Sequence, residues 1–349
     1  MTEPDSEATS QAAVEQPTRN KFVATLARWG MVIILVGAAL NLALAWQSIG
    51  SGASRALDNV APVWLVFAAA LGIAPWFFVA GRIWMWAGFL GSPISFRDAL
   101  RTTAATELTS SISPKAIGGA PAKIALLIDS GVRPGRAASI LMLDNIADVV
   151  FFVAVAPGIA FFTARWRVPE VRLVLLRTLD KLSAAAPWVV GAAVLLALIV
   201  VVWRRRTTRG AGGGSLRRTL AQVRTDFFSA YTLVAQRGKL HVLAAIALTT
   251  GLWFCRASVA TAVIFGLGQQ ADPVLFFLLQ WVVFAMMVFV PTPGAALGAE
   301  ASFAAIFDGF VVEGLLGLLT AGWRFFSFYL PLLFGLVLMP LLSHKRTRG

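Results

Sequence analysis

Residues 62–81 read PVWLVFAAALGIAPWFFVAG, a stretch of twenty residues without a charged side chain. A helix needs about 20 consecutive apolar residues to cross the hydrocarbon core of a bilayer, so this stretch predicts a transmembrane helix. Further stretches are predominantly apolar, at residues 29–46, 137–163, 186–203, 241–266, 273–290, 302–322 and 325–342. We therefore predict an all-α polytopic membrane protein with about eight transmembrane helices.

The composition of the whole chain also indicates a membrane protein. Of the 349 residues, 58% are hydrophobic and only 13% are charged, which argues against an ordinary soluble enzyme and a β-barrel porin. Cys255 is the one cysteine, which excludes a disulfide scaffold and a Cys-based zinc site within the chain. The net charge of +13 could suggest nucleic acid. Because Lys and Arg crowd the cytoplasmic loops of membrane proteins, we expect no nucleic-acid partner.

The distribution of charge predicts the topology. Residues 204–239 hold nine Lys and Arg against Asp226 alone, which assigns this segment to the cytoplasm. With about eight spans, both termini are then cytoplasmic in a bacterial plasma (inner) membrane. The outward loop 164–185 is also basic, which an amphipathic helix at 171–182 on the outer surface would explain. The expected regions are a disordered tail (1–27), a first transmembrane half (28–203), a basic cytoplasmic loop (204–240), a second transmembrane half (241–343) and a basic cytoplasmic tail (344–349).

Two segments rich in Pro, Gly and Ala, residues 95–136 and 289–310, resemble neither simple spans nor loops. Interrupted backbone at membrane depth is tolerated only where protein or a wet cavity satisfies its polar groups, so we predict a broken or re-entrant segment in each half. At a constant offset of 179, the two segments share seven identities in 16 ungapped positions, including Pro114 with Pro293 and Asp129 with Asp308. Chance in an alanine-rich chain is one explanation. A duplication of four spans, with an axis parallel to the membrane normal, is the other.

Ionisable side chains within the apolar stretches are the candidate functional groups, because each needs a partner or a watery cavity. Asp144 and Asp148 share one face of a predicted helix. The full set is Lys115, Lys123, Asp129, Asp144, Asp148, Arg256, Glu300, Asp308 and Arg324. They either pair across helices and hold the bundle together, or line a cavity for a charged lipid headgroup. The two histidines, His241 and His344, lie near none of the intramembrane charges, so neither a metal site nor a nucleophile and base pair is expected.

Three segments are similar to the lysylphosphatidylglycerol synthase transmembrane-region family, also called the flippase-like or UPF0104 family. They read PKAIGGAPAKIALLIDSGVRPGRAASILMLDNIADVVFF (114–152), PTPGAALGAEASF (291–303) and AGWRFFSFYLPLLFG (321–335). The resemblance covers about residues 30–343. It departs at Asp144 and Asn145, where the family has a Glu-Arg pair. At the offset of 179, Asn145 falls on Arg324.

The resemblance implies a lipid translocase that moves a phospholipid or a lipid-linked sugar between leaflets without covalent chemistry. The alternatives are a membrane subunit or enzyme of lipid modification, by aminoacyl or glycosyl transfer, and a scaffold for a separate transferase partner. Membrane lipids, phospholipid or polyprenyl-linked, are the expected partners, and no cofactor or metal is expected. Combining the resemblance with the intramembrane charges, the predicted substrate-binding residues are Lys115, Gly118, Gly119, Lys123, Asp144, Asp148, Arg256, Pro293, Gly294, Glu300 and Arg324.

Overall fold

The computed structural model describes residues 60–113, 118–164, 214–287, 298–312 and 314–343, with a few single positions elsewhere. Within these residues every regular element is a helix and no strand occurs, as predicted. The predicted spans 29–46 and 186–203, the predicted surface helix 171–182 and both predicted tails lie outside the described residues, apart from single positions.

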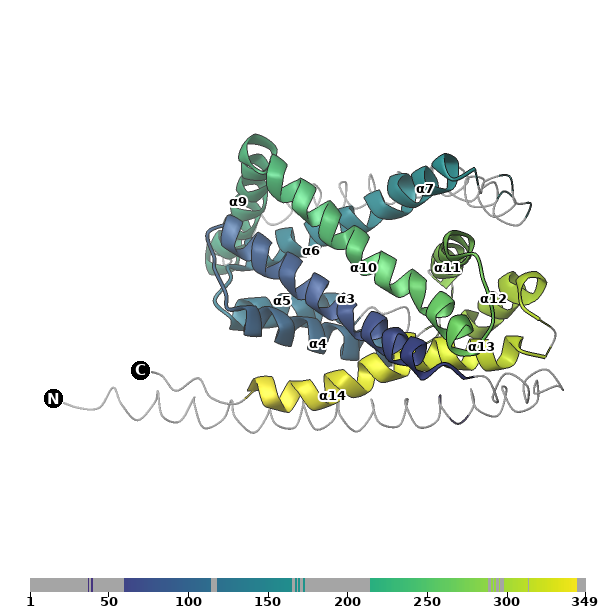
Figure 1. Cartoon of the computed structure of the whole chain (residues 1–349). Coiled ribbons are helices and arrows are strands. Elements are labelled where there is room, and N and C mark those ends of the chain that lie inside the picture. Colours follow the sequence, from purple (N-terminus) through teal and green to yellow (C-terminus); the bar gives the residue numbers. More distant parts are fainter. Residues whose placement is uncertain are drawn as a thin grey trace.

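The centre of the molecule is a pair of antiparallel helices, α3 (Pro62–Phe89) and α10 (Lys239–Gly266), each 28 residues long. They lie side by side (Figure 1), and the Ala61 amide donates a hydrogen bond to the Gly266 carbonyl at 2.9 Å. The sequence predicted α3 only as far as residue 81. The helix continues for two more turns because apolar residues resume after Arg82, whose charge is neutralised elsewhere in the fold.

Two long helices contain a π-helical turn. One consists of α6 (Pro134–Val150), η2 (Phe151–Val155) and α7 (Ala156–Phe162), and matches the predicted span 137–163. The other consists of α13 (Leu316–Arg324), η6 (Phe325–Tyr329) and α14 (Leu330–Ser343). A π turn inside a helix is rare and often marks a functional site.

The predicted spans 302–322 and 325–342 are wrong at their shared boundary. Helix α12 (Gly298–Phe307) and the 3₁₀ turn η5 (Asp308–Phe310) end the first segment early, and one helix then runs from Leu316 to Ser343. The chain bends before Leu316, where Gly314 has φ +84°. No break occurs at Arg324 because its charge is paired, so the helix can continue through it.

Four described helices are long and apolar enough to cross a bilayer: Pro62–Phe89, Pro134–Phe162, Lys239–Gly266 and Leu316–Leu342. Helix α11 (Pro273–Met287) is apolar but shorter, and it occupies the predicted span 273–290. The chain is therefore an all-helical protein with membrane-spanning candidates.

In and around each Pro/Gly-rich segment the structure describes two packed helices, while residues 114–117 and most of 288–297 lie outside the described residues. In the first, α4 (Phe96–Ile112) is followed by the short helix α5 (Gly119–Asp129), which packs against it. In the second, α11 and α12 pack in the same way. The first turn of α5 approaches the end of α4 closely. A Cβ at Gly118 would lie 3.0 Å from the Thr109 carbonyl oxygen, and one at Gly119 would overlap the Ser110 hydroxyl.

Helix α9 (Gly214–Arg237) occupies most of the segment that the sequence predicted as a basic loop. Gly238 alone separates it from α10. Figure 1 shows α9 across the end of the bundle where α3 ends and α10 begins.

The core has two main parts, one along each half of α3. Trp76, Trp86 and neighbouring residues pack with α4, α6 and α14. At the other end, Ala68 and Leu71 join α10, α11, α12 and α13. In this second part Phe303 is stacked between Phe307 and Trp323, with ring centroids 4.2 and 4.4 Å away. The polar network described next lies beside the first part, where α3, α5, α6 and α10 meet.

Candidate functional site

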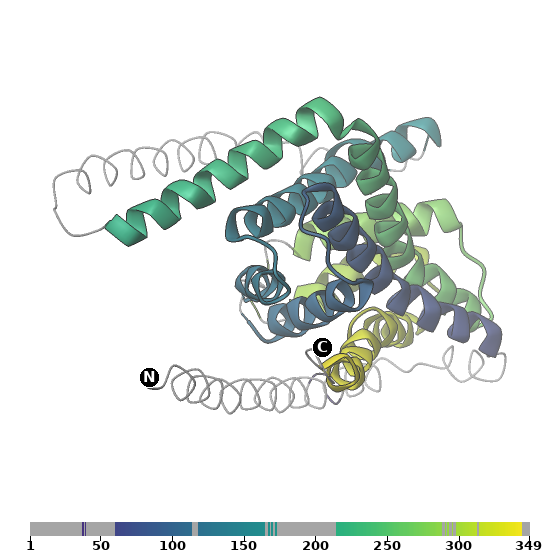
Figure 2. The same cartoon turned by 90° about the vertical axis from the view of Figure 1, so that its left-hand side faces the viewer.

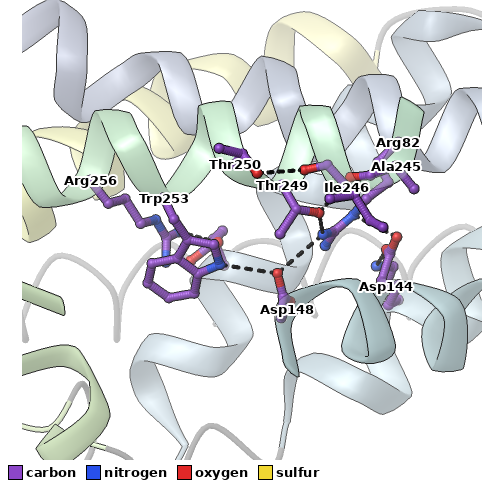
Figure 3. A network of polar contacts seen from close by, with 11 residues as sticks. Arg82, Asp144, Asp148, Ala245, Ile246, Thr249, Thr250, Trp253 and Arg256 are labelled. Carbon is purple, nitrogen blue, oxygen red and sulfur yellow. Dashed lines mark hydrogen bonds and ion pairs between the residues drawn. The ribbon is translucent and has the colours of Figure 1, made fainter. Parts of the chain in front are cut away.

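Arg82 of α3 is the centre of a network of polar contacts (Figure 3). Its Nε lies 2.7 Å from Asp144 Oδ1, and its Nη1 lies 3.1 Å from Asp148 Oδ1. The same Nη1 donates a hydrogen bond to the Thr249 hydroxyl at 2.6 Å. Helices α3, α6 and α10 each supply part of this network, so its geometry depends on how the three helices pack.

Helical periodicity explains how the partners come together. Asp144 and Asp148 are one turn apart on α6 and present both carboxylates to Arg82. On α10, Thr249 and Trp253 are likewise one turn apart. The Thr249 hydroxyl donates to the Ala245 carbonyl at 2.7 Å, which leaves its lone pairs free to accept from Arg82.

Asp144 also pairs with a second cation. Its Oδ2 accepts a hydrogen bond from Lys123 Nζ on α5. The side chains of Arg82, Asp144 and Lys123 are each at most 6% exposed. Buried charges are costly unless they are paired. The Asp144 carboxylate compensates both Arg82 and Lys123, and Asp148 adds a second negative charge beside Arg82.

A second layer of charged groups is partly exposed. Asp148, with 34% of its side chain exposed, accepts a hydrogen bond from Trp253 Nε1 at 3.2 Å. Arg256 Nη2 lies 2.8 Å from Glu107 Oε1 of α4, and both side chains are about one third exposed. The guanidinium of Arg256 also lies over the Trp253 ring, 5.5 Å from its centroid. Trp253 therefore connects the Asp148 carboxylate to the Arg256 and Glu107 pair.

Arg324 and Glu300 form a separate buried ion pair. Arg324 Nε on α13 lies 2.9 Å from Glu300 Oε1 on α12, and the Arg324 guanidinium stacks on Phe328 at 4.1 Å. Both side chains face the protein interior, as the sequence predicted, because either would be costly in hydrocarbon. Between the two alternatives left by the sequence, this geometry favours a pairing that holds α12 and α13 together.

The structure thus distributes the predicted site residues among different roles. Lys123, Asp144, Asp148 and Arg256 belong to the network around Arg82 and Trp253, whereas Glu300 and Arg324 pair with each other. Gly118 and Gly119 lie at the start of α5, where the lack of a side chain permits its contact with α4. The remaining predicted residues, Lys115, Pro293 and Gly294, lie outside the described part of the chain.

Two of the other candidate charges lie outside the network. Asp129, at the end of α5, pairs with Arg101 at 3.5 Å and is half exposed. Asp308 begins the turn η5 after α12.

Four residues of the network are not among the sequence predictions: the uncharged Thr249 and Trp253, and the charged Arg82 and Glu107. The predicted span ends at residue 81, so it excludes Arg82, although apolar residues continue to Phe89. That continuation is the signal that could have placed Arg82 inside the helix. Glu107 lies among Thr, Ser and Ala residues, and only the packing of α4 brings it to Arg256.

The network has the charge pattern of a site for an amphiphile with charges of both signs. It combines three cations, Arg82, Lys123 and Arg256, with three carboxylates, Glu107, Asp144 and Asp148. The buried members can hold the partly exposed ones in place, and the exposed ones can exchange a protein partner for a headgroup. Arginine suits phosphate, and a carboxylate suits an ammonium group.

The comparison with known proteins extends over most of the chain. Residues 29–335 match the family described as "Lysylphosphatidylglycerol synthase TM region". A relative described as a UPF0104 membrane protein, from Archaeoglobus fulgidus, is 24% identical over 278 residues, which is 78% of this chain and 84% of the relative. Together with the apolar helices, this match makes the chain a membrane protein, and it belongs to the lysylphosphatidylglycerol synthase transmembrane-region family.

Proposed function

We propose that this protein is a lipid translocase that moves a phospholipid or a lipid-linked sugar between the leaflets of a bacterial inner membrane, without covalent chemistry. The observation that carries this proposal is the layered network around Arg82. Its buried members, Arg82, Asp144 and Lys123, form a fixed base, and its outer members, Asp148, Arg256 and Glu107, are partly exposed. A headgroup with charges of both signs can pair with Arg256 and with Glu107 in place of the ion pair between these two residues. The headgroup can then leave water without any charge becoming unpaired.

A duplicated architecture, which we also propose, would support alternating exposure of such a site. The order of helices is the same in the two described halves: α3, α4, α5 and α6 with η2 correspond to α10, α11, α12 and α13 with η6. Helices α3 and α10 have 28 residues each, and η2 and η6 have five each.

The buried ion pairs favour the same correspondence. The α5 and α6 pair holds Lys123 with Asp144, and the α12 and α13 pair holds Glu300 with Arg324. The cation and the carboxylate have exchanged helices between the halves. Because the corresponding helices α3 and α10 are antiparallel, the halves would be related by an axis in the membrane plane, and the expected axis along the membrane normal is wrong. Two such inverted halves could rock against each other around a site between them.

The test is lipid movement in vesicles that contain the purified protein. Phospholipids with a fluorescent headgroup reveal translocation when an impermeant reductant bleaches only the outer leaflet. We expect Asp148→Asn and Arg256→Gln each to slow translocation roughly tenfold or more, because each removes a charge-assisted hydrogen bond to the headgroup.

The matched control is Asp129→Asn, which makes the same chemical change at a half-exposed aspartate that pairs with Arg101 outside the network. It should keep the wild-type rate. Wild-type rates in both Asp148→Asn and Arg256→Gln would contradict the proposed site, and absence of translocation by the wild type for phospholipids and lipid-linked sugars would contradict the function.

A further inference from the structure

Helix α9 has a composition that suits neither a membrane span nor an ordinary linker. Its 24 residues include Arg217, Arg218, Arg224 and Arg237 against the single acidic residue Asp226. It is absent from the described helices that are apolar enough to cross a bilayer. So much charge in hydrocarbon would be prohibitive, which leaves α9 at a surface.

The C-terminal half of α9 has two different faces. Ala230 and Val234 are buried in the core beside α6. On another side, Phe228 and Tyr231 are 60% and 38% exposed. The ring of Phe227 contacts both, with centroids 5.8 and 5.9 Å away. Exposed aromatic rings beside arginines are typical of helices that lie at the boundary between headgroups and acyl chains.

The position of α9 in the fold agrees with this boundary. Gly238 alone separates α9 from α10, which is long and apolar enough to span a membrane. Leu240 and Leu243, in the first turns of α10, are largely exposed, as expected for a lipid-facing surface. Figure 2 looks onto this end of the bundle and shows α9 lying across it, with its Gly214 end extending beyond the other described helices.

We propose that α9 is an interfacial helix that binds anionic phospholipid headgroups. The net positive charge of the helix attracts the phosphates, and the rings of Phe228 and Tyr231 enter the interfacial layer. Charge complementarity favours anionic phospholipids as the partner of α9, because the helix carries a net positive charge next to the end of an apolar span. This binding does not depend on the proposed translocation, since α9 supplies no residue to the network around Arg82.

The experiment uses the full-length protein in nanodiscs made of phosphatidylcholine alone or with phosphatidylglycerol. An environment-sensitive fluorophore is attached to Phe228→Cys in a Cys255→Ser background. In the anionic discs we expect blue-shifted emission and protection from iodide, and both should weaken as salt is raised. A label at Gln236→Cys, an exposed polar position on the same helix, should remain accessible to iodide in both discs.

Charge variants separate lipid binding from protein packing. Changing Arg217, Arg218 and Arg224 to Gln should lower the ratio of protected to exposed label about fivefold for each arginine removed. Arg167→Gln, just beyond the far end of α7, removes the same charge at the other end of the bundle and should change nothing. Equal emission in both discs, or protection that persists without lipid or in the triple variant, would overturn the proposal and indicate a protein contact instead.

Discussion

Arg82 of α3 and Asp144 of α6 form an ion pair at 2.7 Å in which neither side chain is more than 4% exposed. The same aspartate binds Lys123 of α5. Three helices therefore depend on one carboxylate for the compensation of buried charge. Removing one member of a buried pair is far more costly than its net contribution to stability, because the other member stays buried and unpaired.

The first prediction concerns this dependence. Asp144→Asn should lower the free energy of unfolding by about 3 to 5 kcal/mol, because Lys123 loses its described carboxylate partner and Arg82 keeps Asp148 as its one described carboxylate. Thermal unfolding of the purified protein in detergent measures the change. Adding Lys123→Met should recover part of the lost stability, since it removes the uncompensated cation. An Asp144→Asn protein as stable as the wild type would show that these charges do not hold the helices together.

The second prediction separates the two layers of the network through Trp253. Trp253→Phe keeps an aromatic ring against Phe151 and Phe152 but removes the Nε1 donor to Asp148. We expect stability to change by only about 1 kcal/mol, while lipid translocation slows several-fold because Asp148 is less well positioned. The measurement pairs the vesicle assay with thermal unfolding. A variant with the wild-type translocation rate would exclude Trp253 as a positioning residue.

The third prediction concerns the Glu300 and Arg324 pair. Glu300→Gln should cost about 3 to 5 kcal/mol of stability, because it leaves the buried Arg324 without its carboxylate partner on α12. Replacing both residues by Met should restore most of the loss. Stability is again measured by thermal unfolding. A stable Glu300→Gln protein that has lost translocation would instead assign Glu300 to headgroup binding.

The fourth prediction concerns the contact between α3 and the π turn η6. A Cβ at Gly72 would overlap the carbonyl oxygen of Phe326, a backbone atom that cannot rotate away. Gly72→Ala should therefore destabilise the protein by about 1 to 3 kcal/mol. Gly81→Ala on the same helix meets no atom within 4 Å and should be neutral or slightly stabilising. Equal melting temperatures for the two variants would contradict the close approach of α3 to η6.

The fifth prediction tests the proposed topology. A cysteine at Ser215, near the start of α9, should react with an impermeant thiol reagent only after the cells are opened, because the basic segment is expected in the cytoplasm. The Cys255→Ser background removes the natural thiol. Labelling of Ser215→Cys in intact cells would place α9 and the segment around it on the outer side.

The sequence by itself determined the class of the fold and the course of several helices. The helices that begin at Pro62, Pro134, Lys239 and Pro273 start within a few residues of the predicted spans, because the requirement for apolar side chains in a bilayer is local to each segment. The same local information set the two Pro/Gly-rich segments apart from simple spans, and the structure describes the short helices α5 and α12 in them. It also singled out Asp144 and Asp148, since a carboxylate in an apolar helix is visible without knowledge of its partner.

Only the tertiary structure decided how the charges are shared. The predicted spans end at residue 81, before Arg82, and at residue 322, before Arg324, since an isolated arginine interrupts a hydropathy pattern. In the fold both lie inside continuous helices, because carboxylates from other helices compensate them. These carboxylates are 62 and 24 residues away along the chain. The cost of a buried charge depends on what lies across the helix interface, and that is set by packing, not by neighbours in sequence.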